Sequence, residues 1–155
     1  MRLCDIEQKI NFDINSESSL GLNTQFSTTS RINRFDKLND LENENAKYRY
    51  WYYGPQLRIA QNIKYTNKKK LFFSDLFLVQ LAWQKLNESR HHQKENENLK
   101  SNRQERVLIK DLNIDFQKRI KKLNIHYGFS IRDQKVTSQA NLRDSIGNLT
   151  YNTTR

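Results

Sequence analysis

The residues that could perform covalent or metal chemistry are few and scattered. His91 and His92 are adjacent, and neighbouring side chains on a helix point about 100° apart, so one helix would not direct both at one ion. Cys4 is the single cysteine, which excludes an internal disulfide framework and a multi-cysteine zinc site. No phosphate-binding glycine loop, nucleophile elbow or H-E-x-x-H motif is present. We therefore expect no enzyme, no metal site and no cofactor.

The strongest signal is the segment 46–70, which holds seven basic side chains, no acidic one and six interleaved aromatic residues. Lysine and arginine neutralise phosphates, and aromatic rings stack on unpaired bases. The segment therefore predicts an RNA contact, to which Lys68, Lys69 and Lys70 contribute by charge alone. The alternative is a tyrosine-rich strand or helix pair that its lysines keep soluble.

Composition and charge agree with a polyanionic partner. The chain of 155 residues has a net charge of +10, with 27 basic and 17 acidic side chains, and only 35% hydrophobic residues. Residues 1–45 carry five basic and eight acidic side chains, so the positive charge belongs to residues 46–155. A modest core and a basic surface favour nucleic acid or an anionic membrane surface. No run of 18 apolar residues occurs, so we expect no membrane span.

Few glycines and a single proline favour long helices and irregular arms over a hairpin-rich fold. The polar residues 1–30 lack a clear period and predict disorder. Apolar spacing predicts helices over 32–41, 56–63, 74–86 (a buried core helix) and 112–123. The polar stretch 88–106 predicts a solvated helix, a loop or an arm. The predicted fold is mainly α: a small helical domain with extended RNA-binding arms and a polar N-terminal extension.

Two segments resemble the small-subunit ribosomal protein four family. Residues 52–59, YYGPQLRI, resemble its Y-x-G-P-x-L-[KR]-[IL] stretch, and residues 122–132, KLNIHYGFSIR, are similar to its K-L-R-x-x-Y-G segment. The matches occur in the family's order and cover about a third of the chain together with their flanks. Asn124 and Ile131 depart from the family's arginine and glutamate, and Cys4 alone cannot form the zinc cluster of some members.

The resemblance implies a structural protein of an organellar, most simply mitochondrial, small ribosomal subunit in the matrix. It would bind the 5′ domain of small-subunit rRNA and neighbouring ribosomal proteins through residues 46–135, between an acidic extension (1–45) and a polar tail (136–155). The family's compact C-terminal module has no counterpart after Gly128, so we expect it to be lost or supplied by a separate chain. The implied RNA-facing residues are Tyr53, Gly54, Pro55, Arg58, Lys122, Tyr127, Gly128 and Arg132.

Two other function classes remain open. An accessory structural subunit of a mitochondrial membrane complex would place lipid headgroups around residues 46–70. A small nucleic-acid enzyme would need a convergent cluster of carboxylates or histidines, which the scattered acids of the basic half do not supply.

Overall fold

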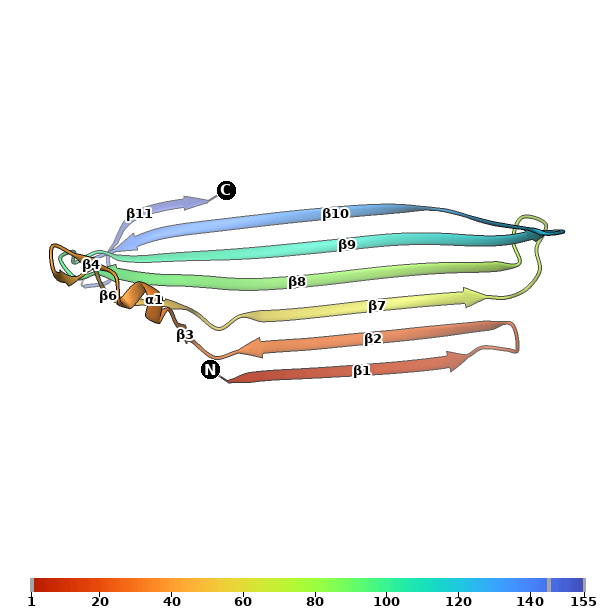
Figure 1. Cartoon of the computed structure of the whole chain (residues 1–155), viewed down its shortest axis with the longest axis horizontal. Helices are drawn as coiled ribbons and strands as arrows, with labels where there is room; N and C mark the ends of the chain where they lie inside the picture. The colour runs from red at the N-terminus through yellow and green to blue at the C-terminus, as the bar shows by residue number, and fades with distance from the viewer. Residues whose placement is uncertain (1, 145, 155) are drawn as a thin grey trace.

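The computed structural model describes residues 2–144 and 146–154, and it is dominated by one antiparallel sheet (Figure 1). The strands of this sheet are β1 (Leu3–Asp13), β2 (Ser18–Thr29), β3 (Ile32–Asn33), β6 (Tyr48–Tyr53), β7 (Leu57–Asn67), β8 (Leu76–Lys94), β9 (Lys100–Ile120), β10 (Leu123–Arg143) and β11 (Leu149–Thr154). A separate small hairpin consists of β4 (Leu41–Glu42) and β5 (Asn45–Ala46), and α1 spans Phe35–Leu38.

The long strands lie side by side in the order β1-β2-β7-β8-β9-β10, and neighbours run in opposite directions. Short connections join them at one end of the sheet, here called the turn end (residues 13–18, 67–76 and 117–123; right in Figure 1). The other connections gather at the opposite loop end (residues 30–56, 94–100 and 143–149), where β6 pairs with the outer part of β8. The strands β8, β9 and β10, with 19–21 residues each, therefore extend from one end of the molecule to the other.

The prediction of a mainly α fold is wrong. The helices predicted over 56–63, 74–86 and 112–123 are parts of β7, β8 and the β9–β10 hairpin, and α1 is the one helix among the described residues. A spacing of four between apolar residues fits one face of a strand as well as one face of a helix, because four is a multiple of the strand period of two. No helix in the described ranges is long and apolar enough to cross a membrane.

The predictions for the polar segments are also wrong. Within residues 1–30, β1 and β2 pair over eleven residues, and within 88–106 the polar parts of β8 and β9 continue their ladder without a break. The inner edge of β1 and both edges of β2, β8 and β9 are hydrogen-bonded to neighbouring strands, so the sheet orders these segments although they contribute little apolar area. Disorder was predicted because pairing between distant segments has no signature in local composition.

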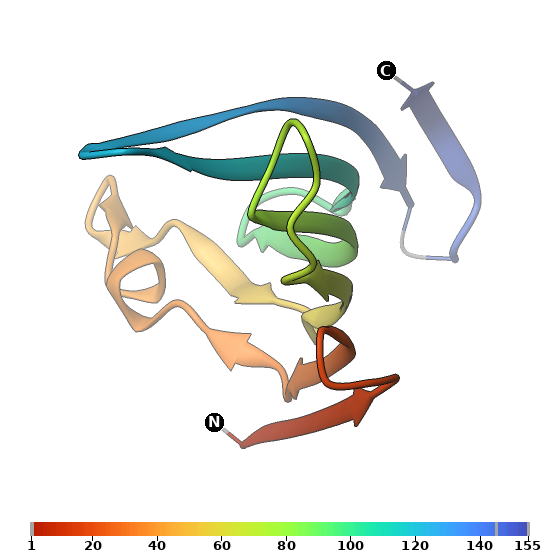
Figure 2. The same ribbon diagram turned by 90° about the vertical axis from the view of Figure 1, so that its right-hand side faces the viewer.

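The sheet is curved and consists of a single layer (Figure 2). Among residues 2–144 and 146–154 no hydrophobic residue is buried, and large side chains such as Phe129 and Ile131 are more than half exposed. In the described part of the chain, the outer edge of β1 has no strand partner, and β11 covers β10 only over Gln139–Arg143. The molecule therefore presents two open faces and two open edges.

Candidate functional site

Alternation along the strands separates an apolar face from a polar face. Register alignment places apolar residues from all six long strands in continuous rows across the sheet. One row consists of Phe12, Leu20, Tyr65, Val79, Ile114 and Phe129, and the next of Ile10, Leu22, Ile63, Leu81, Leu112 and Ile131. Several of these side chains, including Leu81 at 50% and Ile131 at 58%, are well exposed. The apolar face is thus continuous and uncovered.

The apolar side chains of this face form a band with two limits, here called the apolar band. It spans residues 6–12 on β1, 20–26 on β2, 57–65 on β7, 77–83 on β8, 108–116 on β9 and 123–131 on β10. Beyond Trp83 and Ile131 the same face continues toward the loop end with Lys85, Asp133 and Lys135. On β8 and β10 the apolar surface of this face therefore ends part-way along the strand.

The apolar band crosses the strands obliquely. The midpoint of its stretch on β10 is Tyr127, and the midpoint on β1 is Lys9. The residue of β10 that lies in register with Lys9 across the sheet is Arg132, five residues beyond Tyr127. Five residues span ~17 Å and five strand spacings span ~24 Å. The strands are therefore inclined by about 35° to the perpendicular between the two limits of the band. The longest stretches measure ~27 Å along the strand, which corresponds to a band height of ~22 Å along that perpendicular.

Aromatic rings line the limit of the band nearest the turn end. The ring centroids of Phe77 and Phe116 are 5.1 Å apart, and those of Phe116 and Tyr127 are 5.0 Å apart. Tyr65 meets Phe77 edge-on at 6.3 Å, and Phe73 of the β7–β8 loop meets Phe116 at 5.8 Å. A row of aromatic rings thus runs from β7 to β10, at the turn-side limit of the band on β7, β8 and β9 and at its centre on β10.

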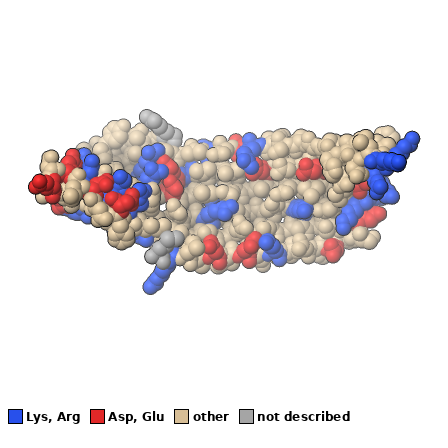
Figure 3. All heavy atoms as spheres, in the orientation of Figure 1, with Lys and Arg blue, Asp and Glu red and all other residues tan. Residues whose placement is uncertain are grey.

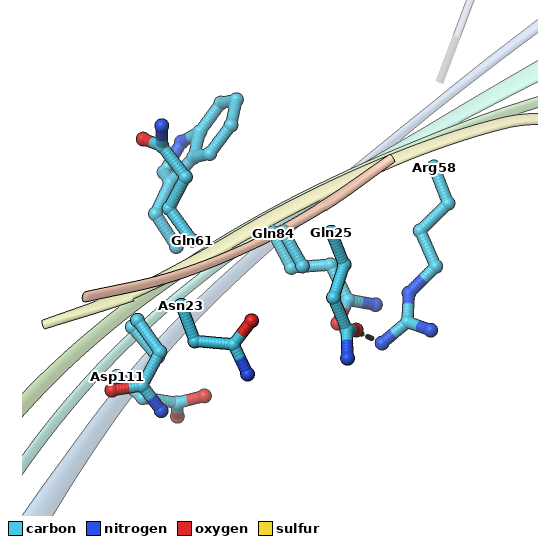
Figure 4. Close-up of a pocket in the computed structure, with 10 residues that line it drawn as sticks. Asn23, Gln25, Arg58, Gln61, Gln84 and Asp111 are labelled. Carbon is cyan, nitrogen blue, oxygen red and sulfur yellow. Dashed lines mark hydrogen bonds between the residues drawn. The ribbon is translucent and has the colours of Figure 1, made fainter. Parts of the chain in front are cut away.

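The polar face carries amides and charges of both signs. Figure 4 shows a depression of about 250 Å³ where Asn23, Gln25, Arg58, Gln84 and Asp111 lie on one side of the strands. The Arg58 guanidinium donates to Gln84 at 3.2 Å, and Gln25 donates to Glu7 at 3.0 Å. Such side chains retain hydrogen-bonding partners only beside water or polar groups. This face is therefore suited to an aqueous surface.

The residues predicted to bind RNA do not converge on one surface. Tyr53, Gly54 and Pro55 lie at the loop end, and Lys68, Lys69, Lys70 and Lys122 lie at the turn end. Tyr127 belongs to the apolar face, whereas Arg58, Gly128 and Arg132 belong to the polar face. The eleven residues of β7 separate Pro55 from Lys68.

Several of these side chains have partners within the sheet. Arg132 forms an ion pair with Asp111 at 2.5 Å, and the Tyr127 hydroxyl donates to the carbonyl of Phe73. A Cβ atom on Gly128 would collide with the carbonyl oxygen of Ile114, so this glycine permits close approach of β9. These contacts give the second family-like segment a role in the β9–β10 hairpin.

The loop end contains a compact cluster of aromatic, histidine and arginine side chains. Tyr52 stacks on His91 with centroids 4.8 Å apart, and the Arg31 guanidinium lies 3.6 Å from the Tyr52 ring centre. Trp51 stacks on His92, where burial and the nearby Lys94 charge lower the pKa of the imidazole. His91 hydrogen-bonds Asn102 and Ser89 through its two ring nitrogens. In the described ranges, no group of three or more metal-ligating side chains occurs.

Sequence reasoning missed the part of the apolar face that β1 and β2 contribute. Apolar side chains recur at even spacings in residues 6–12 and 20–26, and this alternation was the available signal. It was outweighed by the serine, threonine and asparagine residues between them, which face the other side or interrupt the rows.

No protein-family model, curated protein or solved structure matches this chain. Its function is therefore inferred from the geometry of the two faces and the two ends.

Proposed function

We propose that the sheet is embedded in a lipid bilayer, with the apolar band against the acyl chains and the polar face turned toward water. The protein would then form part of a wall between lipid and an aqueous space. The observation that carries this proposal is the oblique apolar band, which spans seven to nine residues on each of six neighbouring strands. Strands of membrane-embedded sheets are inclined by ~35–45°, and the inclination of the band, about 35°, lies at the edge of that range.

The dimensions of the band support this proposal. Its height of ~22 Å is close to the ~25 Å apolar surface of membrane-embedded sheets. Tyr65, an amphipathic ring, lies at the turn-side limit of the band on β7, the position that such rings favour at membrane interfaces. Lys110, the charged residue of the band, lies in register with Trp83 and Asp133, where the band ends on the neighbouring strands. Its ammonium group is therefore close to water.

Lipid accounts for the band better than water or a second protein does. Monomeric soluble proteins rarely expose apolar patches larger than a few hundred Å², whereas this surface crosses six strands. A protein partner would bury a patch with the outline of its own binding surface, and nothing would require that patch to cross six strands obliquely. A bilayer imposes a similar apolar height on every strand that crosses it.

The open edges add a requirement. Unpaired backbone N–H and C=O groups in the hydrocarbon cost several kcal/mol each. The proposal therefore includes further strands, from this or another chain, along β1 and along the part of β10 that β11 leaves uncovered.

Binding of small-subunit rRNA stays a prediction, and its predicted residues are distributed over both ends and both faces of the sheet. The membrane alternative inferred from the sequence placed headgroups around residues 46–70. The present proposal assigns acyl contact to residues 57–65 of that segment and to the other five strands of the band.

The two tryptophans allow a direct test, because one lies in the band and the other beyond it. The variant Trp51→Phe leaves Trp83 as the reporter of the apolar face, and Trp83→Phe leaves Trp51 as its matched control at the loop end. Each full-length variant is reconstituted in phosphatidylcholine vesicles with brominated acyl chains, which quench indole fluorescence on contact. We expect strong quenching of Trp83 and little quenching of Trp51.

Equal fluorescence of Trp83 in brominated and ordinary vesicles would refute acyl contact. Recovery of the native chain in ribosomal particles, with RNA crosslinks from residues 48–70 and no association with membranes, would refute the proposal in favour of the rRNA prediction.

A further inference from the structure

The turn end carries an ordered loop that combines cations with exposed aromatic rings. Residues 68–73, KKKLFF, join β7 to β8, and Phe72 is 100% exposed. The loop is fixed at its base, because Lys68 donates its backbone N–H to the backbone carbonyl of Glu17 at 2.7 Å and the Lys118 ammonium donates to the Leu71 carbonyl at 2.8 Å. Its exposed side chains are therefore held outward by an anchored backbone.

One carboxylate near this loop is neutralised internally. Asp75 accepts a hydrogen bond from the backbone N–H of Arg119 at 2.8 Å and one from the Lys118 ammonium at 3.0 Å. The hydrogen bond from the Arg119 N–H and then the Lys118 ammonium lower the pKa of Asp75. Within the described residues Asp75 forms its ion pair with Lys118 and none with the other cations of the turn end.

Six cations of the turn end form no ion pair in the described part of the chain: Lys68, Lys69, Lys70, Arg119, Lys121 and Lys122. Asp13 and Glu17 are the acidic side chains at this end outside the Asp75 pair. Figure 3 shows the basic side chains gathered at the tip of the molecule. The surface is therefore strongly positive next to the apolar band.

We propose that this turn end binds the headgroups of anionic phospholipids, an inference that rests on the proposed position of the sheet in a bilayer. Phe73 contacts the aromatic row through Phe116, so the loop is continuous with the border of the apolar band. Phe72 then enters the boundary between headgroups and acyl chains, and Lys68–Lys70 face the phosphates. Basic residues next to an apolar membrane segment attract anionic lipid.

The combination distinguishes lipid from RNA as the partner. An RNA surface requires rings that can stack on bases beside the cations. Here the Phe73 ring is engaged with Phe116 and adjoins an apolar surface that RNA would leave uncovered. The lysines of this loop lie directly beside the apolar band, as cations and apolar side chains lie side by side at a bilayer interface.

The test measures lipid selectivity of the full-length chain reconstituted in mixed vesicles of phosphatidylcholine and phosphatidylglycerol. Electron spin resonance of spin-labelled phosphatidylglycerol or phosphatidylcholine reports the lipid immobilised at the protein surface. We expect about fivefold preference for phosphatidylglycerol, the factor produced by one favourable cation–phosphate contact. The triple variant K68Q/K69Q/K70Q should lose most of this preference, and added salt should weaken it.

The matched control is K47Q/K94Q/K100Q, which removes the same charge from the loop end, far from both limits of the apolar band. It should keep the preference of the wild-type chain. Equal preferences in the two triple variants, or no preference in the wild-type chain, would overturn the headgroup site while leaving the bilayer position intact. Absence of an immobilised signal from either lipid would instead overturn the bilayer position.

Discussion

The substitution Leu81→Arg tests the reasoning about the apolar face most sharply. Leu81 lies within the band on β8, in register with Ile63 and Leu112, about 6 Å from the limit at Trp83 and about 11 Å from the limit at Phe77. An arginine at the midplane of a lipid-facing strand costs ~2–4 kcal/mol, which corresponds to a roughly 30- to 1,000-fold loss in the folding equilibrium. In water the same change, at a side chain that is 50% exposed, would have little effect.

The assay is equilibrium unfolding by urea of the chain folded in phosphatidylcholine bilayers, followed by tryptophan fluorescence. Gln80→Arg is the matched control, since Gln80 is adjacent on β8 and belongs to the polar face. Leu123→Arg at the turn-side limit of the band should cost only ~0–1 kcal/mol. Equal losses for the Leu81 and Gln80 variants, or no dependence on depth between the Leu81 and Leu123 variants, would refute lipid contact.

Three further predictions concern local structure. Gly128→Ala should destabilise the β9–β10 hairpin by ~1–3 kcal/mol, because its Cβ would collide with the Ile114 carbonyl, and urea unfolding measures the loss. Lys121 has a φ of 53°, so Lys121→Gly should stabilise the hairpin by up to ~1 kcal/mol in the same assay. His92 has a lowered pKa, so its stabilising contribution is complete above pH ~6.5 and is lost as the pH falls through the lower folded-state pKa. In a Trp83→Phe background, Trp51 fluorescence should therefore report loosening of the loop end on acidification, and His92→Gln should abolish it.

The sequence allowed prediction of some local features. Gly54-Pro55 was interpreted as a turn signal, and residues 54–56 interrupt the strands β6 and β7. A tyrosine-rich strand was one alternative for the segment that became β6. The short helix predicted over 32–41 contains α1. These features depend on neighbouring residues, whose preferences are visible in the sequence.

The fold and the apolar face could not be predicted in this way. Leu112, Phe116 and Ile120 lie on one face of β9, but their spacing fits a helix equally well. The β9–β10 turn consists of Lys121 and Lys122, without the Asn-Gly or Asp-Gly pair that usually marks a two-residue hairpin. The band became visible only when strand registers aligned residues as distant as Ile10 and Ile131, because its two rows depend on pairing across the whole sheet.

The polar halves of β8, β9 and β10 have a consequence for how the loop end meets its surroundings. From Trp83 to Lys94, β8 continues eleven residues past the band, which raises its tip ~30 Å above the lipid in the proposed orientation. This height exceeds three Debye lengths of ~8 Å at physiological ionic strength. The ion pairs that Arg49 and Lys94 form with Glu95 and Glu97 are therefore screened from the headgroup charge. The extended parts of β8, β9 and β10 would hold the charges of the loop end in bulk water, where solutes and partners meet them independently of the lipid composition of the membrane.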